Sequence, residues 1–191
     1  MEQKLKAKLK DDETLLWSAR PEAFETLDKT HKNHFITKAA IITVIFAAIV
    51  IVYITAAINT NSEIQIPVIL IGLVAALYGI FGEFLDANKL RNKTLYALTD
   101  QRIIAMMGMG FEAVDYTRLT DYDFVTDSDG HTTLISGPRV REAKEYSRRS
   151  ATVCGAQNNA ESGICEGYAL YGITEHVKTI DKILSEHINV E

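Results

Sequence analysis

Two cysteines are the residues of this chain most suited to covalent chemistry. Cys154 and Cys165 could form a disulfide, bind a metal as a pair, or supply a nucleophile. They are too few for a disulfide scaffold or a four-ligand zinc site. In a reducing cytoplasm we expect two free thiols.

His31 and His34 place two imidazoles three residues apart, shortly before a long apolar segment. Two ligands make at most half of a zinc site, and no neighbouring cysteine or carboxylate cluster completes it in the sequence. We therefore expect an interfacial polar face whose long side chains reach towards water, and we predict no metal and no cofactor.

The run Asp127-Ser128-Asp129-Gly130 is similar to part of a calcium-binding loop. With Gly130 at the sixth loop position, Val125 and Ser136 fall where carboxylates are required, so the calcium interpretation fails. A β-hairpin turn explains the run, because glycine adopts positive φ without strain. Asp100 and Arg102 flank another tight turn, which we expect them to cap or to bridge across the strands. The sequence contains no G-x-S-x-G, P-loop, H-E-x-x-H or paired-carboxylate signature.

Basic residues form two further groups that have two interpretations each. The first group is in the N-terminal ten residues and the second is Arg148-Arg149. Either could contact an anionic membrane surface or lie on a solvated segment. The first group consists of Lys4, Lys6, Lys8 and Lys10.

Two apolar segments must position everything else. Residues 39–58 contain no charge over a length that spans roughly 30 Å as a helix. Residues 66–82 form a second uncharged run at the short end of the spanning range, with Pro67 near its first turn, where a missing N–H costs little. The two segments predict a transmembrane helix hairpin over 37–85. Neither has an ionisable residue at mid-depth, so we expect an anchor and no pore.

Orientation follows from the distribution of lysine and arginine. The connecting turn at 59–65 has neither residue, whereas both outer flanks are basic. The positive-inside rule therefore predicts two spans in the cell membrane, with both termini cytoplasmic. The flanking residues are Lys29, Lys32, Lys38, Lys89, Arg91 and Lys93.

After the second apolar segment, short β-like runs alternate with turns. A final amphipathic helix is expected over 175–188, with Thr174 as its N-terminal cap. We expect an α+β membrane protein in which antiparallel strands and one C-terminal helix form a barrel or sandwich. The predicted strands are 94–98, 102–107, 111–116, 121–127, 131–136 and 168–173.

Two motifs resemble the bacterial pleckstrin-homology-like domains of membrane proteins, of the type with a two-helix membrane hairpin. Residues 96–104, YALTDQRII, are similar to that family's Y-x-L-T-x-x-R-I hairpin, and 13–21, ETLLWSARP, to its opening strand. The tail, from Tyr171-Gly172-Ile173 through the helix that follows, is also similar. The resemblance implies a pleckstrin-homology-like fold that acts as a binding or assembly module, without implying a ligand.

These elements divide the chain into three parts. Residues 1–36 form a cytoplasmic segment that includes a first strand at 13–21, residues 37–85 form the hairpin, and residues 86–191 form the cytoplasmic domain. Within that domain, 137–166 is a long connection in which basic helical turns and loop are expected. Its composition offers little to bury, so we expect a loosely attached embellishment.

Function is predicted from this architecture. Residues 94–191 carry 9 basic and 15 acidic side chains, a net charge of −6, which argues against nucleic-acid binding. We expect a non-enzymatic, membrane-anchored binding module with a protein or peptide partner, or a homo-oligomer. The alternatives are a membrane-bound enzyme that uses Cys154, Cys165, His131 and His176, and an accessory subunit of a transporter.

Overall fold

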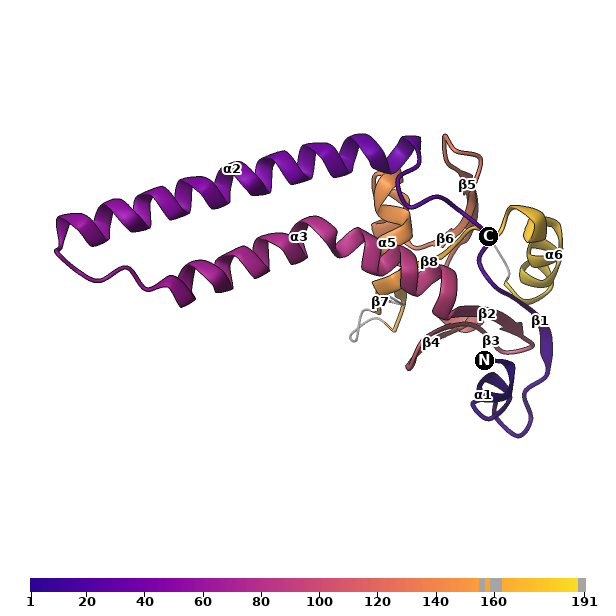
Figure 1. The fold of residues 1–191 in the computed structure, drawn as a ribbon. Coiled ribbons are helices and arrows are strands. Elements are labelled where there is room, and N and C mark those ends of the chain that lie inside the picture. The colour runs from indigo at the N-terminus through magenta and orange to yellow at the C-terminus, as the bar shows by residue number, and fades with distance from the viewer. Residues whose placement is uncertain (155–156, 159–162, 189–191) are drawn as a thin grey trace.

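Two long antiparallel helices extend away from a compact sheet region, and the computed structural model describes residues 1–154, 157–158 and 163–188 (Figure 1). Helix α2 is Lys29–Asn59 and helix α3 is Ile66–Lys93. Both are long and apolar enough to cross a membrane, judged by length and composition. The predicted helix pair is confirmed, and both helices extend beyond the apolar segments into the sheet region. Pro67 lies in the first turn of α3.

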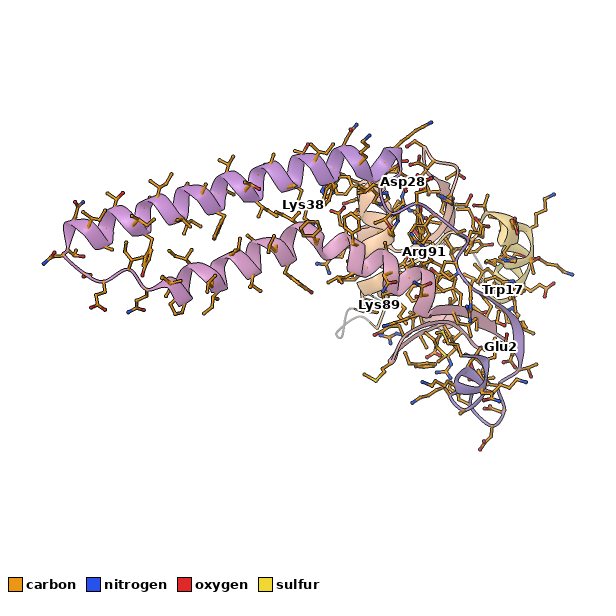
Figure 2. All side chains as sticks on the ribbon, in the orientation of Figure 1. Glu2, Trp17, Asp28, Lys38, Lys89 and Arg91 are labelled. Carbon is orange, nitrogen blue, oxygen red and sulfur yellow. The ribbon has the colours of Figure 1, made fainter. Side chains whose placement is uncertain are left out.

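The hairpin exposes its apolar side chains instead of burying them. In the most apolar 18-residue window of each helix, 6% of α2 and none of α3 is buried. The two helices touch each other along one face only, and most of their surface faces outward (Figure 2). The large apolar residues with at least half of their surface exposed include Ile45, Ile49, Ile51, Val52, Ile71 and Val74.

Two four-stranded antiparallel sheets form the compact region. The first has the order β1-β2-β3-β4, and the second has the order β5-β6-β8-β7. Every strand predicted from the sequence is present. The strands are β1 Leu15–Ala19, β2 Thr94–Thr99, β3 Arg102–Met107, β4 Gly110–Asp115, β5 Asp123–Thr126, β6 Thr132–Ser136, β7 Gln157–Asn158 and β8 Cys165–Tyr171.

The main core combines residues of both sheets with one face of the C-terminal helix α6, Val177–His187. Ile180 and Leu184 are fully buried there, as their spacing predicts. A short 3-10 turn, η3 Thr174–His176, precedes this helix. The predicted cap at Thr174 is wrong: its hydroxyl oxygen accepts a hydrogen bond from the Thr132 amide, and the Glu175 amide donates to Glu22 instead.

The N-terminal residues form helix α1, Glu2–Lys6, which packs on the outer face of the first sheet. Leu5 is 1% exposed and contacts a small cluster that includes Ile104 and Met106. The expectation of a solvated extension or a membrane-surface segment is therefore wrong for Leu5. The apolar residue between the lysines is a packing residue, and the lysines around it stay exposed.

The connection at 137–166 is more structured than expected. It contains α4 Pro138–Arg141, the 3-10 turn η2 Glu145–Ser147 and α5 Arg148–Cys154 before β7. The predicted basic helical turns are confirmed. The described part is not a loose embellishment, since Val140, Arg149 and Thr152 are buried.

Another 3-10 turn, η1 Tyr116–Arg118, joins β4 to β5.

Candidate functional site

Polar groups gather where the hairpin meets the sheets, and the segment between β1 and α2 is held there by two arginines. Arg91 of α3 donates to the Phe24 carbonyl oxygen at 2.9 Å and to the Thr26 hydroxyl at 3.0 Å. Arg149 of α5 donates to the Thr26 carbonyl oxygen at 3.1 Å. The Phe24 ring is buried, and the guanidinium carbons of Arg91 and Arg149 lie 5.2 and 4.3 Å from its centre. This segment is therefore fixed from both sides by hydrogen bonds and cation–π contacts.

Asp28 links the start of α2 to α5. Its carboxylate accepts a hydrogen bond from the His31 amide at 2.8 Å, as an N-terminal cap does. The same oxygen lies 2.6 Å from Nδ1 of His31, and the other oxygen forms an ion pair with Arg149. All three side chains are nearly fully buried. The expectation that His31 lies on an exposed interfacial face is wrong, because Asp28 gives it a buried partner.

The network continues through Tyr171 of β8. Its hydroxyl accepts a hydrogen bond from Arg149 at 3.2 Å and donates to Asp127 at 3.3 Å. Burial raises the pKa of Tyr171 well above its ordinary value, so this hydroxyl stays protonated and remains a donor. The chain of contacts thus runs from α2 through α5 to the β5–β6 hairpin.

The turn at 127–130 has a second role that the sequence did not reveal. Gly130 has φ of 89°, which confirms the predicted hairpin turn. Asp129 accepts hydrogen bonds from the amides of Lys29 at 3.2 Å and Thr30 at 2.9 Å, so it caps α2 from outside. Burial alone would raise the pKa of Asp129, but the hydrogen bonds from Thr30 and Lys29 outweigh burial and lower it. The acidic turn was visible in the sequence, but spacing along the sequence could not identify the start of α2 as its partner.

A second polar cluster lies between the two helices, one turn further out. Lys38 donates to Oε1 of Glu83 at 3.1 Å, and the His34 ring stacks on Tyr146 with centres 3.7 Å apart. Nδ1 of His34 is 3.1 Å from the same Glu83 oxygen, without hydrogen-bond geometry. That nitrogen and Oε2 of Glu83 are buried and have no hydrogen-bond partner in the described structure. With Asp86, these residues line a cavity of about 300 Å³.

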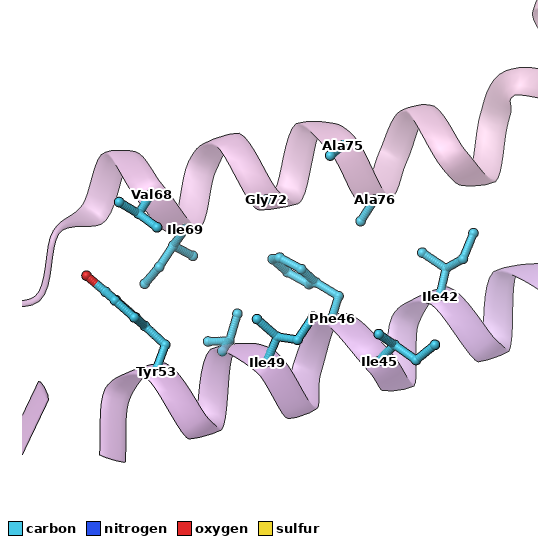
Figure 3. Close-up of a pocket in the computed structure, with 11 residues that line it drawn as sticks. Ile42, Ile45, Phe46, Ile49, Tyr53, Val68, Ile69, Gly72, Ala75 and Ala76 are labelled. Atoms are coloured by element: carbon cyan, nitrogen blue, oxygen red, sulfur yellow. The ribbon is translucent and has the colours of Figure 1, made fainter. Parts of the chain in front are cut away.

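Beyond this cavity the facing sides of α2 and α3 form an apolar groove of about 370 Å³ (Figure 3). Its only polar side-chain group is the Tyr53 hydroxyl, which already accepts a hydrogen bond from the Gln65 amide at 3.0 Å. Gly72 leaves room for the Phe46 ring, 3.1 Å from where a Cβ would lie. The groove can therefore hold only an apolar group.

Arg102, predicted to cap a tight turn or to pair across strands, forms a separate ion pair with Glu13, two residues before β1. Arg102 binds Glu13 through two hydrogen bonds of 2.7 Å each, and Asp100 accepts from the Thr14 amide at 2.9 Å. Burial raises the pKa of Glu13, but hydrogen bonds from Arg102, the Lys10 amide and Thr99 outweigh burial and lower it to about 2. Arg102 of β3 therefore pairs with a residue that precedes β1, so its partner lies outside the strands.

The candidate catalytic residues are not brought together. Cys165 is a buried free cysteine whose pKa burial raises, which disfavours a reactive thiolate. His131 packs against Phe24, whereas His176 packs against Trp17. No contact joins Cys165 to either histidine within the described residues. The side chain of Cys154 lies outside the described residues.

The arrangement at the base can couple two parts of the chain mechanically and electrostatically, but it aligns no nucleophile with a base in the described part. No group of three or more His, Cys, Asp or Glu side chains is placed to hold a metal within residues 1–152 and 163–188. Comparison of the chain with protein-family models, with curated proteins and with solved structures gave no match.

Proposed function

We propose that this chain is a membrane-anchored binding or assembly module. The apolar hairpin crosses the bilayer, and a pleckstrin-homology-like domain stands at the cytoplasmic face with its orientation fixed. One observation carries this proposal: the outer part of the hairpin exposes apolar side chains on nearly all of its surface. Such a surface is unfavourable in water and favourable in lipid.

Charge at the two ends of the hairpin supports the orientation. Figure 2 shows Lys38, Lys89 and Arg91 at the end next to the sheets, while the turn between α2 and α3 has no lysine or arginine. The basic end fits a cytoplasmic position under the positive-inside rule.

The connections to the domain support a fixed orientation. Helix α3 ends at Lys93 and β2 begins at Thr94, so no linker separates them. On the other side, Arg91, Arg149 and Asp129 hold the segment that leads into α2. Because both helices are held, the sheets cannot rotate freely relative to the hairpin.

The two antiparallel sheets with one C-terminal helix are compatible with the pleckstrin-homology-like fold that the sequence resembles. The resemblance to that fold is what supports a role in binding. The net charge of −6 over residues 94–191 favours a neutral or basic protein surface over a phosphate-rich partner.

Crosslinking in native membranes tests the proposal. Membranes that contain the full chain are treated with an amine-reactive crosslinker, solubilised in detergent and separated by size. We expect a discrete crosslinked species, either a self-oligomer or one partner complex. A chain that stays monomeric and uncrosslinked over a wide range of expression levels contradicts the binding role.

A further inference from the structure

The cavity lined by His34, Lys38, Glu83 and Asp86 combines two carboxylates, a lysine and an imidazole. Three elements contribute to it: α2, α3 and the η2–α5 segment of the domain. It lies at the level where the apolar segments end, which is where lipid headgroups are found in a membrane-spanning hairpin.

The charge in this cavity favours a cationic group. Two carboxylates, Glu83 and Asp86, face a single lysine, and that lysine already donates to Glu83 at 3.1 Å. Oε2 of Glu83 is buried and accepts no hydrogen bond within the described residues. An ammonium group with N–H donors would satisfy this oxygen, whereas an anionic group directly beside it would be repelled by both carboxylates.

Groups that suit a phosphate lie in the same cavity. Lys38 and Ser150 line it, and each carries a donor that can reach a phosphate oxygen. The cavity thus offers acceptors for an ammonium and donors for a phosphate oxygen within one space of about 300 Å³.

The apolar groove adjoins the cavity. Gly79 lines the cavity and Ile42 lines the groove, and a Cβ on Gly79 would lie 3.3 Å from Cδ1 of Ile42. The groove continues along the same pair of helices to Tyr53 (Figure 3). A molecule with a zwitterionic head and an apolar chain could occupy both spaces at once.

We infer that α2 and α3 bind an aminophospholipid, with the primary ammonium on Glu83 and Asp86, the phosphate beside Lys38, and one acyl chain in the groove. This inference rests on the proposed membrane insertion, and it gives the hairpin a specific lipid ligand. A bound lipid would join the hairpin to Tyr146 of the domain side, because Tyr146 lines the same cavity.

Lipid enrichment tests the inference. The full chain is reconstituted in nanodiscs with equal parts of phosphatidylethanolamine, phosphatidylcholine and phosphatidylglycerol, extracted mildly, and analysed by native mass spectrometry. We expect phosphatidylethanolamine to be enriched about tenfold over both others among retained lipids. Phosphatidylcholine keeps the charge but lacks N–H donors, so it isolates the hydrogen bonds.

The double variant Glu83→Gln with Asp86→Asn should reduce the enrichment to about onefold, whereas Glu112→Gln on β4 should leave it unchanged. The comparison among lipids needs no variant, so it holds even if the double variant folds poorly. Equal retention of all three lipids, or preference for phosphatidylglycerol, would overturn the inference. Displacement of the lipid by an equimolar amount of soluble phosphoethanolamine would also overturn it, because the apolar chain would then contribute nothing.

Failure of this inference can be separated from failure of the proposed function. Before reconstitution, the membranes that contain the chain are washed with alkaline carbonate to establish insertion. A chain that stays in the membrane but enriches no lipid refutes the lipid site alone. A chain that the wash removes refutes the membrane anchor.

Discussion

In the outer part of the hairpin, isoleucine, valine and leucine side chains are exposed and no charge interrupts residues 39–58, whereas at its base Asp28, His31 and Arg149 are buried. A protein surface usually carries few large apolar side chains and its interior few charged ones, and each of these regions reverses that pattern. The exposed apolar side chains of the outer part are unfavourable in water, whereas at the base the pairing of Asp28 with Arg149 offsets the cost of burying these two charges. The comparison shows that the same two helices present an apolar surface at one end and paired polar groups at the other.

Breaking the base should have the largest effect. Arg149→Ala leaves the Asp28 carboxylate buried without its ion pair, so we expect the free energy of unfolding to fall by about 3–5 kcal/mol. Chemical denaturation in detergent, followed by the fluorescence of Trp17, measures it. Arg139→Ala removes an exposed arginine nearby and should change stability by less than about 0.5 kcal/mol. Equal effects of the two variants would show that the buried network does not stabilise the base.

Placing a charge in the outer part should have the next largest effect. Ile49 is 60% exposed near the middle of the first apolar segment. Ile49→Asp should disfavour insertion by about 3 kcal/mol, and the fraction of chain that resists carbonate extraction should fall. Ile49→Leu is the matched control and should behave like the wild type. If the aspartate variant remained fully membrane-bound, lipid would not surround this position.

The Glu13–Arg102 pair gives a pH dependence that is separate from the hairpin. Glu13 has a folded-state pKa of about 2, below its ordinary value of 4.5. The contribution of Glu13 to the free energy of unfolding, roughly 2–3 kcal/mol, is therefore complete above about pH 4.5. This contribution is lost as the pH falls towards 2. Unfolding measured between pH 6 and pH 2 should show this loss, and Glu13→Gln should remove that part of the dependence. An unchanged pH profile in the variant would contradict the assignment.

Removing the outside cap of α2 should have the smallest effect. Asp129→Ala leaves the amides of Lys29 and Thr30 without their acceptor, so we expect a loss of about 1 kcal/mol. Hydrogen exchange at those two amides should rise more than exchange elsewhere in α2. Asp123→Ala, an exposed residue of β5, should leave both amides protected. If the Asp129 variant exchanged no faster, the turn would not hold the helix.

The elements of the fold could be predicted because their signals are local. The uncharged run at 39–58, the turn at Gly130 and the spacing of Ile180 and Leu184 each determine a nearby conformation. The contacts at the base could not be predicted, because Asp28 and Arg149 are 121 residues apart. The environment of His31 was predicted wrongly for the same reason. A polar residue near an apolar segment indicates a membrane interface unless a buried partner is known. The burial of Leu5 was not predicted, because a helix of five residues gives too short a pattern to show which side packs.

Depth-dependent quenching by lipids brominated along the acyl chain tests membrane insertion most directly. A tryptophan is placed at Val52, or at Glu63 in the connecting turn, in a chain that carries Trp17→Phe. A hairpin that crosses the bilayer predicts strong quenching at Val52 and weak quenching at Glu63 in vesicles. Equal, weak quenching at both positions would mean that the exposed apolar side chains are covered by protein, and that the hairpin does not span a membrane.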